Sequence, residues 1–515
     1  MRRYRISTEI LILILENLDP QTLWRACQAS SDFTHNSAFS RIYNVVMEFQ
    51  SLRYRFELAL AAMKDGRAPR AHAPALARYQ LLLSYKKDWP RLRWSQESRM
   101  QIPTPAQVGM SGGFVHRILT DGQQYCLELS ELPSHRTGRP LTRTRHIRFS
   151  TPPIESVMVD PSQHLLVTTH LFSLGGVVAI QIHLRDLWTF AKHRWAPALA
   201  YEFSTQSAGR VSHMSLQICG SKLGISMEFA TGQVKHLVMD WHTLHARWFE
   251  EGDILFLNET CMLVSAKYHG RPALNLYNIT DVANVTNMRD YEFPEVWANA
   301  AITFSSNSSP PSDAVANPDA LFYPDPAARL LMLNVNLSGA SNPRQSSHTK
   351  GPSVWLFANE SYFRPPTSRR DSVRVSWKHW SQHCYIRNVQ PSPFLRGPHV
   401  VGTKVLYLDA EPVQLSRNEM GSRPATIPRL VLIDFKPFSD PANPPAKTWT
   451  MGGKTTMVPY ESTRDIPYTT IDNLNIDAVR MNEDNIVLIM ELRQGMRNLS
   501  ILTFGTPPVP RPRHK

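Results

Sequence analysis

The chain has 515 residues, more than one ordinary hydrophobic core supports, so at least two domains are expected. Apolar residues make up 42% of the sequence, which indicates a globular protein and excludes a wholly disordered one. The formal net charge of +13 favours acidic partners, but no recognised nucleic-acid-binding module occurs, so we expect no nucleic acid partner.

The first predicted element is a helix from Ser7 to about Leu18. Ser7 is a good N-cap, and Glu9 places negative charge in the first turn, where the helix dipole favours it. The apolar run Ile10–Leu15 makes the helix apolar on nearly every side, so it must be covered from more than one direction. A signal peptide is not expected, because the run is shorter than the roughly 7–15 residues that one needs.

Three further helical segments follow within the first hundred residues. Asp19 can cap a second helix, and Pro20 fits its first position. Apolar residues then recur every three or four positions from about Arg41 to Lys64 and from about Ala75 to Asp88, which predicts one long and one shorter helix.

The start of the chain resembles an F-box. The usual pattern is Leu-Pro-x-Glu-Ile-Leu, then Ile-Leu, Leu, Val-Ser and an aromatic residue, and the matching residues are Ile6-Ser7-Thr8-Glu9-Ile10-Leu11, Ile14-Leu15, Leu18-Asp19, Leu23, Ala29-Ser30 and Phe33. The segments Glu57–Gly66 and Lys86–Trp94 resemble a fungal subgroup of F-box proteins more specifically. Ser7 replaces the usual Pro, and Ala29 replaces the usual Val, which removes roughly 1 kcal/mol of apolar burial.

This resemblance implies a substrate-recognition subunit of an SCF-type cullin-RING E3 ubiquitin ligase. The helices would bind a Skp-family adaptor and, through it, cullin, while the rest of the chain would recruit an unknown protein target. The chain would then carry no catalytic residue of its own. By helix-in-groove binding, five residues are expected to contact the adaptor or directly support the contact: Ile6, Ile10, Ile14, Leu18 and Leu23.

From about Gly112 onward, short apolar runs bounded by turn residues predict β-strands. A strand, a polar turn such as Asp160-Pro161-Ser162, and two further strands recur about every 40 to 80 residues. We therefore predict a multidomain α + β chain, with a small N-terminal helical F-box-like module and a large all-β domain. The all-β domain is predicted to be a degenerate six- or seven-bladed β-propeller, with a β-sandwich or two smaller β domains as alternatives.

The predicted domain boundaries follow from these patterns. Residues 1–40 form the F-box-like module, 41–100 a helical extension, 101–504 the propeller-like domain with loop insertions rich in Pro and Ser, and 505–515 a disordered basic tail.

Five arginines lie between Pro133 and Pro153 with no acid among them, namely Arg136, Arg139, Arg143, Arg145 and Arg148. Their guanidinium groups could bind phosphate or an acidic peptide. The alternative is a solvated basic loop.

Other motifs carry less chemistry. Gly452-Gly453-Lys454-Thr455 imitates the end of a P-loop, but the required first Gly is Thr448, so a hairpin turn is favoured. His379 and His383 have helical metal-ligand spacing without a supporting acid. The five cysteines are far apart and form no CxxC pair, which supports neither disulfides nor zinc. We expect no metal, cofactor or membrane association, and a cytoplasmic and/or nuclear location.

Two other functions remain open. The chain could be a propeller scaffold with no ligase role, in which the apolar helix packs entirely on Phe49, Phe56 and their neighbours. Exposure of Ile10 and Ile14 in the free protein separates this from adaptor docking. An enzyme that uses the propeller channel is the third possibility, and no motif supports it.

Overall fold

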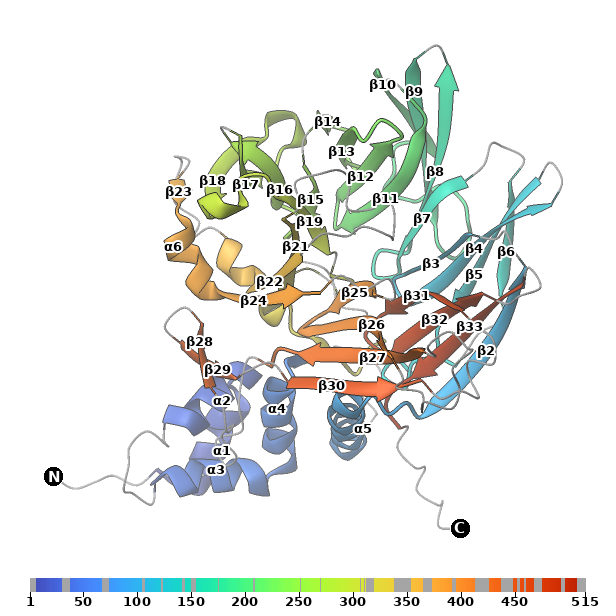
Figure 1. Ribbon diagram of the computed structural model, residues 1–515. Coiled ribbons are helices and arrows are strands. Elements are labelled where there is room, and N and C mark those ends of the chain that lie inside the picture. Colours follow the sequence, from blue (N-terminus) through green and yellow to red (C-terminus); the bar gives the residue numbers. More distant parts are fainter. Residues whose placement is uncertain are drawn as a thin grey trace, which may run out of the picture.

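Seven sheets, each built on four antiparallel strands, form a ring, and a helical module lies beside it (Figure 1). The computed structural model describes residues 6–29, 38–66, 74–103, 107–121, 124–140, 144–149, 154–174, 176–206, 209–250, 252–268, 270–305, 307–309, 311, 319–337, 353–364, 373–390, 395–412, 426–436, 448–451, 454–457, 460–466, 475–491 and 496–506. The ring of seven sheets confirms the predicted propeller and shows that it has seven blades. Within the described residues, no helix is both long and apolar enough to cross a membrane.

The helices of the module are α1 (Thr8–Glu16), α2 (Pro20–Ala29), α3 (Ala38–Glu48), α4 (Gln50–Leu60) and α5 (Ala75–Asp88). The first four blades are β3 (Gln107–Ser111), β4 (Phe114–Asp121), β5 (Gln124–Glu131) and β6 (Arg145–Phe149); β7 (Ile154–Asp160), β8 (Leu165–Leu174), β9 (Val177–Asp186) and β10 (Ala200–Gln206); β11 (Val211–Cys219), β12 (Lys222–Phe229), β13 (Val234–Asp240) and β14 (Ala246–Phe249); and β15 (Ile254–Phe256), β16 (Cys261–Tyr268), β17 (Arg271–Asn278) and β18 (Thr286–Glu292).

Blade 5 consists of β19 (Ala301–Ser305), β21 (Leu330–Asn336), β22 (Ser353–Asn359) and β24 (Cys384–Val389), and blade 6 of β25 (Arg396–Val401), β26 (Lys404–Pro412), β27 (Thr426–Asp434) and β30 (Tyr460–Asp465). In these six blades the first strand is innermost and lines the central channel (Figure 1). A short strand, β23 (Val373–Val375), adds to blade 4 in parallel with β18.

The two ends of the sequence close the ring in blade 7. This blade takes β31 (Asn475–Met481), β32 (Asn485–Glu491) and β33 (Met496–Thr503) from the end of the chain and β2 (Gln96–Pro103) from its beginning. Strands β2 and β33 pair over eight residues, from Gln96 with Thr503 to Pro103 with Met496. Because a closed ring leaves no long unpaired edge, this pairing completes the propeller. The β-domain thus begins at Gln96, before the predicted boundary at 101.

The predicted helix from Arg41 to Lys64 is wrong as a single element. The chain becomes extended at Phe49, with φ −92° and ψ 116°, which separates α3 from α4. Val45 and Val46 of α3 nevertheless pack on the same core as Phe56 of α4. Spacing of three or four residues therefore continued across a bend, and the periodicity alone did not reveal it.

The helical module is fastened to the propeller by a short sheet. Strand β1 (Met63–Asp65) pairs with β20 (Phe322–Pro324), which lies in the insertion between β19 and β21 of blade 5. A side chain at Gly66 would place a Cβ 1.7 Å from the Ala320 carbonyl oxygen, so this close approach requires glycine. At the far end of α5, the Trp89 ring stacks on Phe504 beyond β33, with ring centroids 3.9 Å apart.

A two-stranded hairpin extends from blade 6. Strands β28 (Thr448–Met451) and β29 (Lys454–Met457) pair directly, with Met451 opposite Lys454. The predicted hairpin at the P-loop-like sequence is confirmed, although Gly452 and Gly453 themselves lie outside the described residues. The predicted basic tail lies outside them from residue 507 onward.

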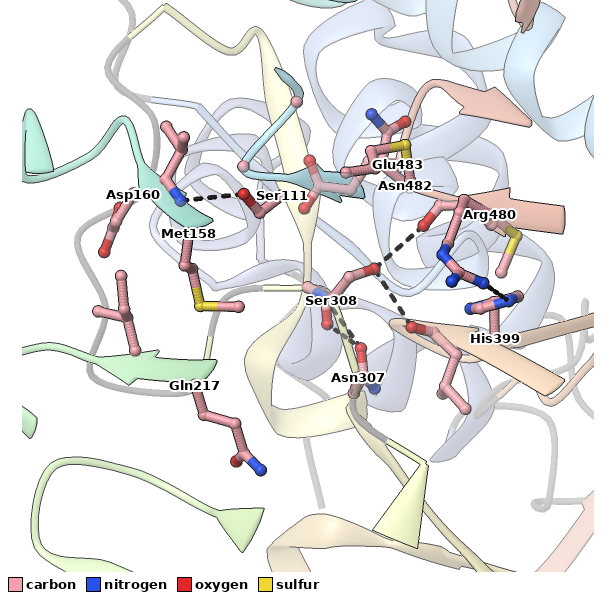
Figure 2. Close-up of a pocket in the computed structure, with 18 of the residues that line it drawn as sticks. Ser111, Met158, Asp160, Gln217, Asn307, Ser308, His399, Arg480, Asn482 and Glu483 are labelled. Carbon is pink, nitrogen blue, oxygen red and sulfur yellow. Dashed lines mark hydrogen bonds between the residues drawn. The ribbon is translucent and has the colours of Figure 1, made fainter. Parts of the chain in front are cut away.

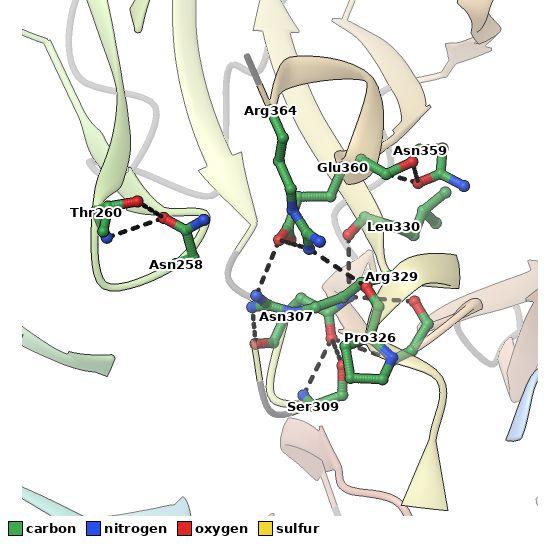
Figure 3. A network of polar contacts seen from close by, with 12 residues as sticks. Asn258, Thr260, Asn307, Ser309, Pro326, Arg329, Leu330, Asn359, Glu360 and Arg364 are labelled. Atoms are coloured by element: carbon green, nitrogen blue, oxygen red, sulfur yellow. Dashed lines mark hydrogen bonds and ion pairs between the residues drawn. The ribbon is translucent and has the colours of Figure 1, made fainter. Parts of the chain in front are cut away.

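Several Asn-x-Ser/Thr sequences owe their pattern to turn chemistry (Figure 3). The Asn258 Oδ1 accepts hydrogen bonds from the Thr260 backbone N–H and hydroxyl, at 2.9 and 3.1 Å. Asn307 with Ser309 and Asn359 with Ser361 repeat the arrangement. In such a turn the Asn side chain imitates a backbone acceptor, and a hydroxyl two residues later adds a second bond. These sequences are therefore explained by local structure without glycosylation.

The Asn307 turn also joins three blades. Its Nδ2 donates to the carbonyl oxygens of Leu330 in blade 5 and Gly402 in blade 6, at 2.9 and 3.1 Å. The neighbouring Ser308 hydroxyl lies 3.3 Å from the carbonyl oxygens of Val400 in blade 6 and Met481 in blade 7, and its single proton can be donated to either. The two bonds to Leu330 and Gly402 come from the Asn307 amide, and because Asn307 is buried, no solvent donor can replace it there.

The substitution Asn307→Asp is expected to lower the free energy of unfolding by about 2–4 kcal/mol, since it removes both donors and buries a charge beside two carbonyl oxygens. Asn258→Asp changes the same type of turn at the surface and is expected to alter stability by no more than about 0.5 kcal/mol. Urea denaturation of the two variants gives the comparison. Equal effects would show that the inter-blade contacts of Asn307 contribute little.

Candidate functional site

The most exposed apolar surface of the helical module is one side of α1. Four of the ten large apolar side chains exposed in the described part of the chain fall within nine consecutive residues: Ile6 at 51% exposure, Ile10 at 53%, Leu13 at 60% and Ile14 at 47%. We call these four residues the α1 patch. Isolated exposed apolar residues are common on proteins, whereas such clusters mark interaction surfaces.

Local sequence explains why α1 forms in this position. Ser7 takes an extended conformation, and its hydroxyl accepts a 3.4 Å hydrogen bond from the Ile10 N–H. The helix ends at Glu16, and Arg55 of α4 donates to the carbonyl oxygens of Glu16 and Leu18, which have no partner within the helix. Ser7 therefore caps the helix without the proline usual in the F-box pattern.

The opposite side of α1 anchors it to the module. Leu15 is buried, and Leu11 and Ile12 pack partly against the same cluster, which contains Cys27 of α2 and Phe56 of α4. Thus the helix uses one side for the core and leaves the α1 patch outside. The continuous apolar run in the sequence reflects two separate apolar faces.

The five predicted adaptor residues divide into two groups. Ile6, Ile10 and Ile14 belong to the α1 patch, while Leu18 is partly buried against the helical core. Leu23 has 0% exposure and lies inside that core, so it can support a contact surface but cannot touch a partner directly. Leu13, at 60% exposure, joins this surface without being among the predicted adaptor residues, and its position in the apolar run Ile10–Leu15 is the sequence signal for it. The Ala29 side chain, Ser30 and Phe33 lie outside the described residues.

The predicted basic cluster does not form one surface. Arg136 is buried at 4% exposure, where it pairs with Glu483 and Asp484 and donates to the Phe322 carbonyl at 2.7 Å. The prediction that Arg136 binds an acidic partner is therefore wrong, because its charge is already neutralised inside the protein.

The other four arginines have separate environments. Arg139 pairs with Asp319 at 2.8 Å. Arg145 is 3.4 Å from Glu131 and lies over the Trp188 ring, and Arg148 is exposed. Arg143 lies outside the described residues. The acids that pair with Arg136 and Arg139 are far away in sequence, so their absence from the local segment was misleading.

A second candidate site is the central channel, which encloses a cavity of about 760 Å³ (Figure 2). Inner strands of the blades supply its wall, including Gln217 of β11, His399 of β25 and Arg480 of β31. Asp160 at the end of β7 and Glu483 in the turn after β31 line it as well. The sequence does not point to this site, because its wall is assembled from residues of all seven blades, spread from Met110 to Asn485.

Two histidines near Arg480 are held neutral. Burial, followed by the Arg480 charge, lowers the pKa of His116 to about 4 and that of His399 to about 3. The His116 ring covers the backbone of β3, where a Cβ at Gly109 would lie 2.0 Å from its Nε2 atom. Gly109 is thus required by the position of the imidazole.

His116 should make the protein less stable in acid. The unfolded chain takes up a proton near pH 6.5, whereas folded His116 stays neutral until about pH 4, so the free energy of unfolding falls as the pH is lowered between these values. The expected contribution is about 1.4 kcal/mol per pH unit. Urea denaturation from pH 7 to pH 4 should give a smaller slope for His116→Gln than for the wild type. An unchanged slope would contradict the assignment.

Metal binding has no support in the described part of the chain, where no group of three or more His, Cys, Asp or Glu side chains could hold an ion. His379 lies in a short helix, α6 (Trp377–Trp380), and His383 lies in the following 3₁₀ turn. His383 stacks on Tyr362, with ring centroids 4.1 Å apart, which gives it a packing role.

No protein-family model and no curated protein sequence matches this chain. Among solved structures, it is similar to the WD40 domain of SCAP from fission yeast, with 7% identity, a TM-score of 0.38 and coverage of 79% of this chain and 99% of the other. It is also similar to the WD40 domain of Toxoplasma gondii coronin, with 8% identity, a TM-score of 0.37 and coverage of 81% of this chain and 88% of the other. A third similar structure is the β-propeller domain of the Trilobed protease from Pyrococcus furiosus, with 10% identity, a TM-score of 0.37 and coverage of 78% of this chain and 99% of the other. The seven-bladed fold of this chain is defined by its own strand pairing.

Proposed function

We propose that this chain is a substrate-recognition subunit of an SCF-type cullin-RING E3 ubiquitin ligase. In this role the α1 patch binds a Skp-family adaptor, which connects the chain to cullin, and the propeller recruits a protein target. The proposal combines the F-box resemblance of residues 6–33 with the exposure of the α1 patch. It assigns the chain no catalytic step, because its work is to bring a target close to the other subunits.

The single observation that carries the proposal is the exposure of Ile10 and Ile14, at 53% and 47%. A scaffold whose helix served only as a cap would bury these side chains on its own core. Their exposure leaves an apolar face for a partner, and an amphipathic helix in a hydrophobic groove is a common mode of protein recognition. Because of this exposure, a scaffold with no ligase role comes second to the adaptor-binding subunit.

The attachment of the module supports a role in positioning. Tyr85 of α5 donates to Asp484, which also binds Arg136 at 3.0 Å, so the helices are connected to blades 1 and 7 by buried polar contacts. Together with the pairing of β1 and β20, these contacts place α1 in a defined relation to the ring (Figure 1). Such a connection suits a subunit that holds its target at a set position relative to the adaptor.

The test is affinity purification of the tagged full chain from its native host under proteasome inhibition. The proposal predicts recovery of a Skp-family adaptor and cullin in stoichiometric amounts, together with target proteins. Recovery of propeller partners without adaptor or cullin would support the scaffold instead.

A further inference from the structure

Arg480 places a positive charge in the channel without an ion-pair partner among the described residues. Its Nη1 group is 3.2 Å from the His399 Nε2 atom and 3.1 Å from the carbonyl oxygen of Val479. It forms no ion pair with a residue that the structure describes, and Asp477, whose charge acts on it, pairs with Arg497 at 3.6 Å. Figure 2 shows the guanidinium beside His399 at the edge of the cavity. Its Nε and Nη2 groups hydrogen bond no other residue in the described ranges, so they are available to a ligand.

The other arginines that line the same cavity are neutralised. Arg136 pairs with Asp484 and Glu483, Arg139 with Asp319, and Arg329 with the buried Glu360 at 3.2 Å. Figure 3 shows the Arg329 pair, which Arg364 joins from the other side. Channel arginines are thus generally matched by acids of this chain, and Arg480 is an exception among the described residues.

The acids of the cavity do not compensate Arg480. Glu483 and Asp484 are engaged by Arg136, while Asp160 accepts hydrogen bonds from Ser162 and Gln163 on the opposite side of the cavity (Figure 2). The nearby rings of His116 and His399 are neutral, and their pKa values are lowered in part by Arg480 itself. Burial lowers the pKa of Arg480, and the charge of Asp477, which pairs with Arg497, offsets this only in part.

A charge in such an environment is costly unless it is paired. Guanidinium groups match the planar geometry of carboxylates and the oxygens of phosphate, and they bind both through paired hydrogen bonds. The cavity volume of about 760 Å³ falls within the roughly 300–1,000 Å³ of typical small-molecule sites. Its size and enclosure within the ring suit a small molecule better than a folded partner.

We propose that the propeller channel binds a small oxyanion, a carboxylate or a phosphate, through the free hydrogen-bond donors of Arg480. The anion supplies the negative charge that the described part of the chain does not pair with Arg480, and His399 keeps the guanidinium directed along the cavity wall. This site is separate from the α1 patch, so its existence does not depend on adaptor docking.

Isothermal titration of the full chain with inorganic phosphate and with citrate tests the proposal and distinguishes its two forms. Saturable binding of phosphate alone identifies a phosphate site, and binding of citrate alone a carboxylate site. Arg480→Gln should weaken the bound probe at least tenfold. Arg271→Gln, which removes an exposed arginine from the outer part of blade 4, should change it less than twofold. No binding of either probe to the wild type, or equal binding by Arg480→Gln, would overturn the proposal.

A second measurement uses the wild-type chain and does not depend on how well a variant folds. Phenylglyoxal modifies accessible arginines, and peptide mapping gives the rate at each position. Phosphate or citrate should slow the modification of Arg480 at least fivefold and leave Arg271 unchanged. Equal rates at Arg480 with and without both probes would count against an anion at this position.

Discussion

The double substitution Ile10→Asp with Ile14→Asp is expected to weaken binding of a Skp-family adaptor by at least about 100-fold. Each isoleucine contributes roughly 1.5 kcal/mol when an apolar groove covers it, and each aspartate adds the cost of placing a charge there. A loss of about 3 kcal/mol corresponds to a change of about two orders of magnitude in Kd. Titration of the purified adaptor into each full chain measures the effect.

Folding should survive this change, because both side chains point away from the helical core and surface substitutions usually shift stability by less than about 0.5 kcal/mol. A matched control is Val177→Asp with Val296→Asp, which also replaces two exposed apolar residues but does so on the propeller. The control variant should bind adaptor as the wild type does. Equal losses in both variants would mean that the α1 patch has no special role.

The substitution Arg136→Met is expected to lower the free energy of unfolding by roughly 3–5 kcal/mol. It leaves the buried Asp484 and the partly buried Glu483 without their counter-charge and removes the bond to the Phe322 carbonyl. Burial alone would raise the pKa of Asp484, but the Arg136 charge and its hydrogen bonds hold the pKa below its usual value. Removing that charge should therefore destabilise the junction between the helices, blade 1 and blade 7.

Arg148→Met is the matched control, since it makes the same replacement at an exposed position twelve residues away. Its effect should stay within about 0.5 kcal/mol. In the Arg136→Met background, Asp484→Asn should recover part of the loss, because it removes one uncompensated charge. Urea denaturation with near-ultraviolet circular dichroism follows all three chains. A small effect of Arg136→Met would show that the buried pair adds little to stability.

Features set by neighbouring residues could be predicted from the sequence. The capped start of α1 at Ser7, the restart at Asp19-Pro20 and the turn at Asp160-Pro161-Ser162 all appear where expected. Each depends on contacts within three residues, so the local chemistry is visible in the sequence. The alternation of strands and polar turns likewise favoured a propeller, although it left open the choice between six and seven blades and the alternatives of a β-sandwich or two smaller β domains.

Features set by distant residues could not be predicted. The partner of Arg136 is Asp484, 348 positions later, and the segment around Arg136 alone suggested a basic surface. The pairing of β2 with β33 joins the two ends of the domain in the same way. Arg480 and His399 meet only because blades 6 and 7 are neighbours in the ring. In each case the ring closure brings together residues whose relation the sequence does not express.

The bend at Phe49 shows a different limit. The apolar stripe of the predicted long helix is real, since residues of both α3 and α4 pack on one core. A helical period records which side is buried, but it does not record whether the axis continues straight. The sequence is equally silent on the two faces of α1, because an uninterrupted apolar run does not show which side packs on the core and which side a partner would cover.

Hydrogen exchange of the full chain, with and without a saturating Skp-family adaptor, tests the docking role of α1 most directly. The backbone amides of α1 and α2 should exchange at least tenfold more slowly in the complex, while those of the propeller strands keep their rates. Unchanged exchange in α1, or protection confined to the propeller, would contradict adaptor docking through the α1 patch.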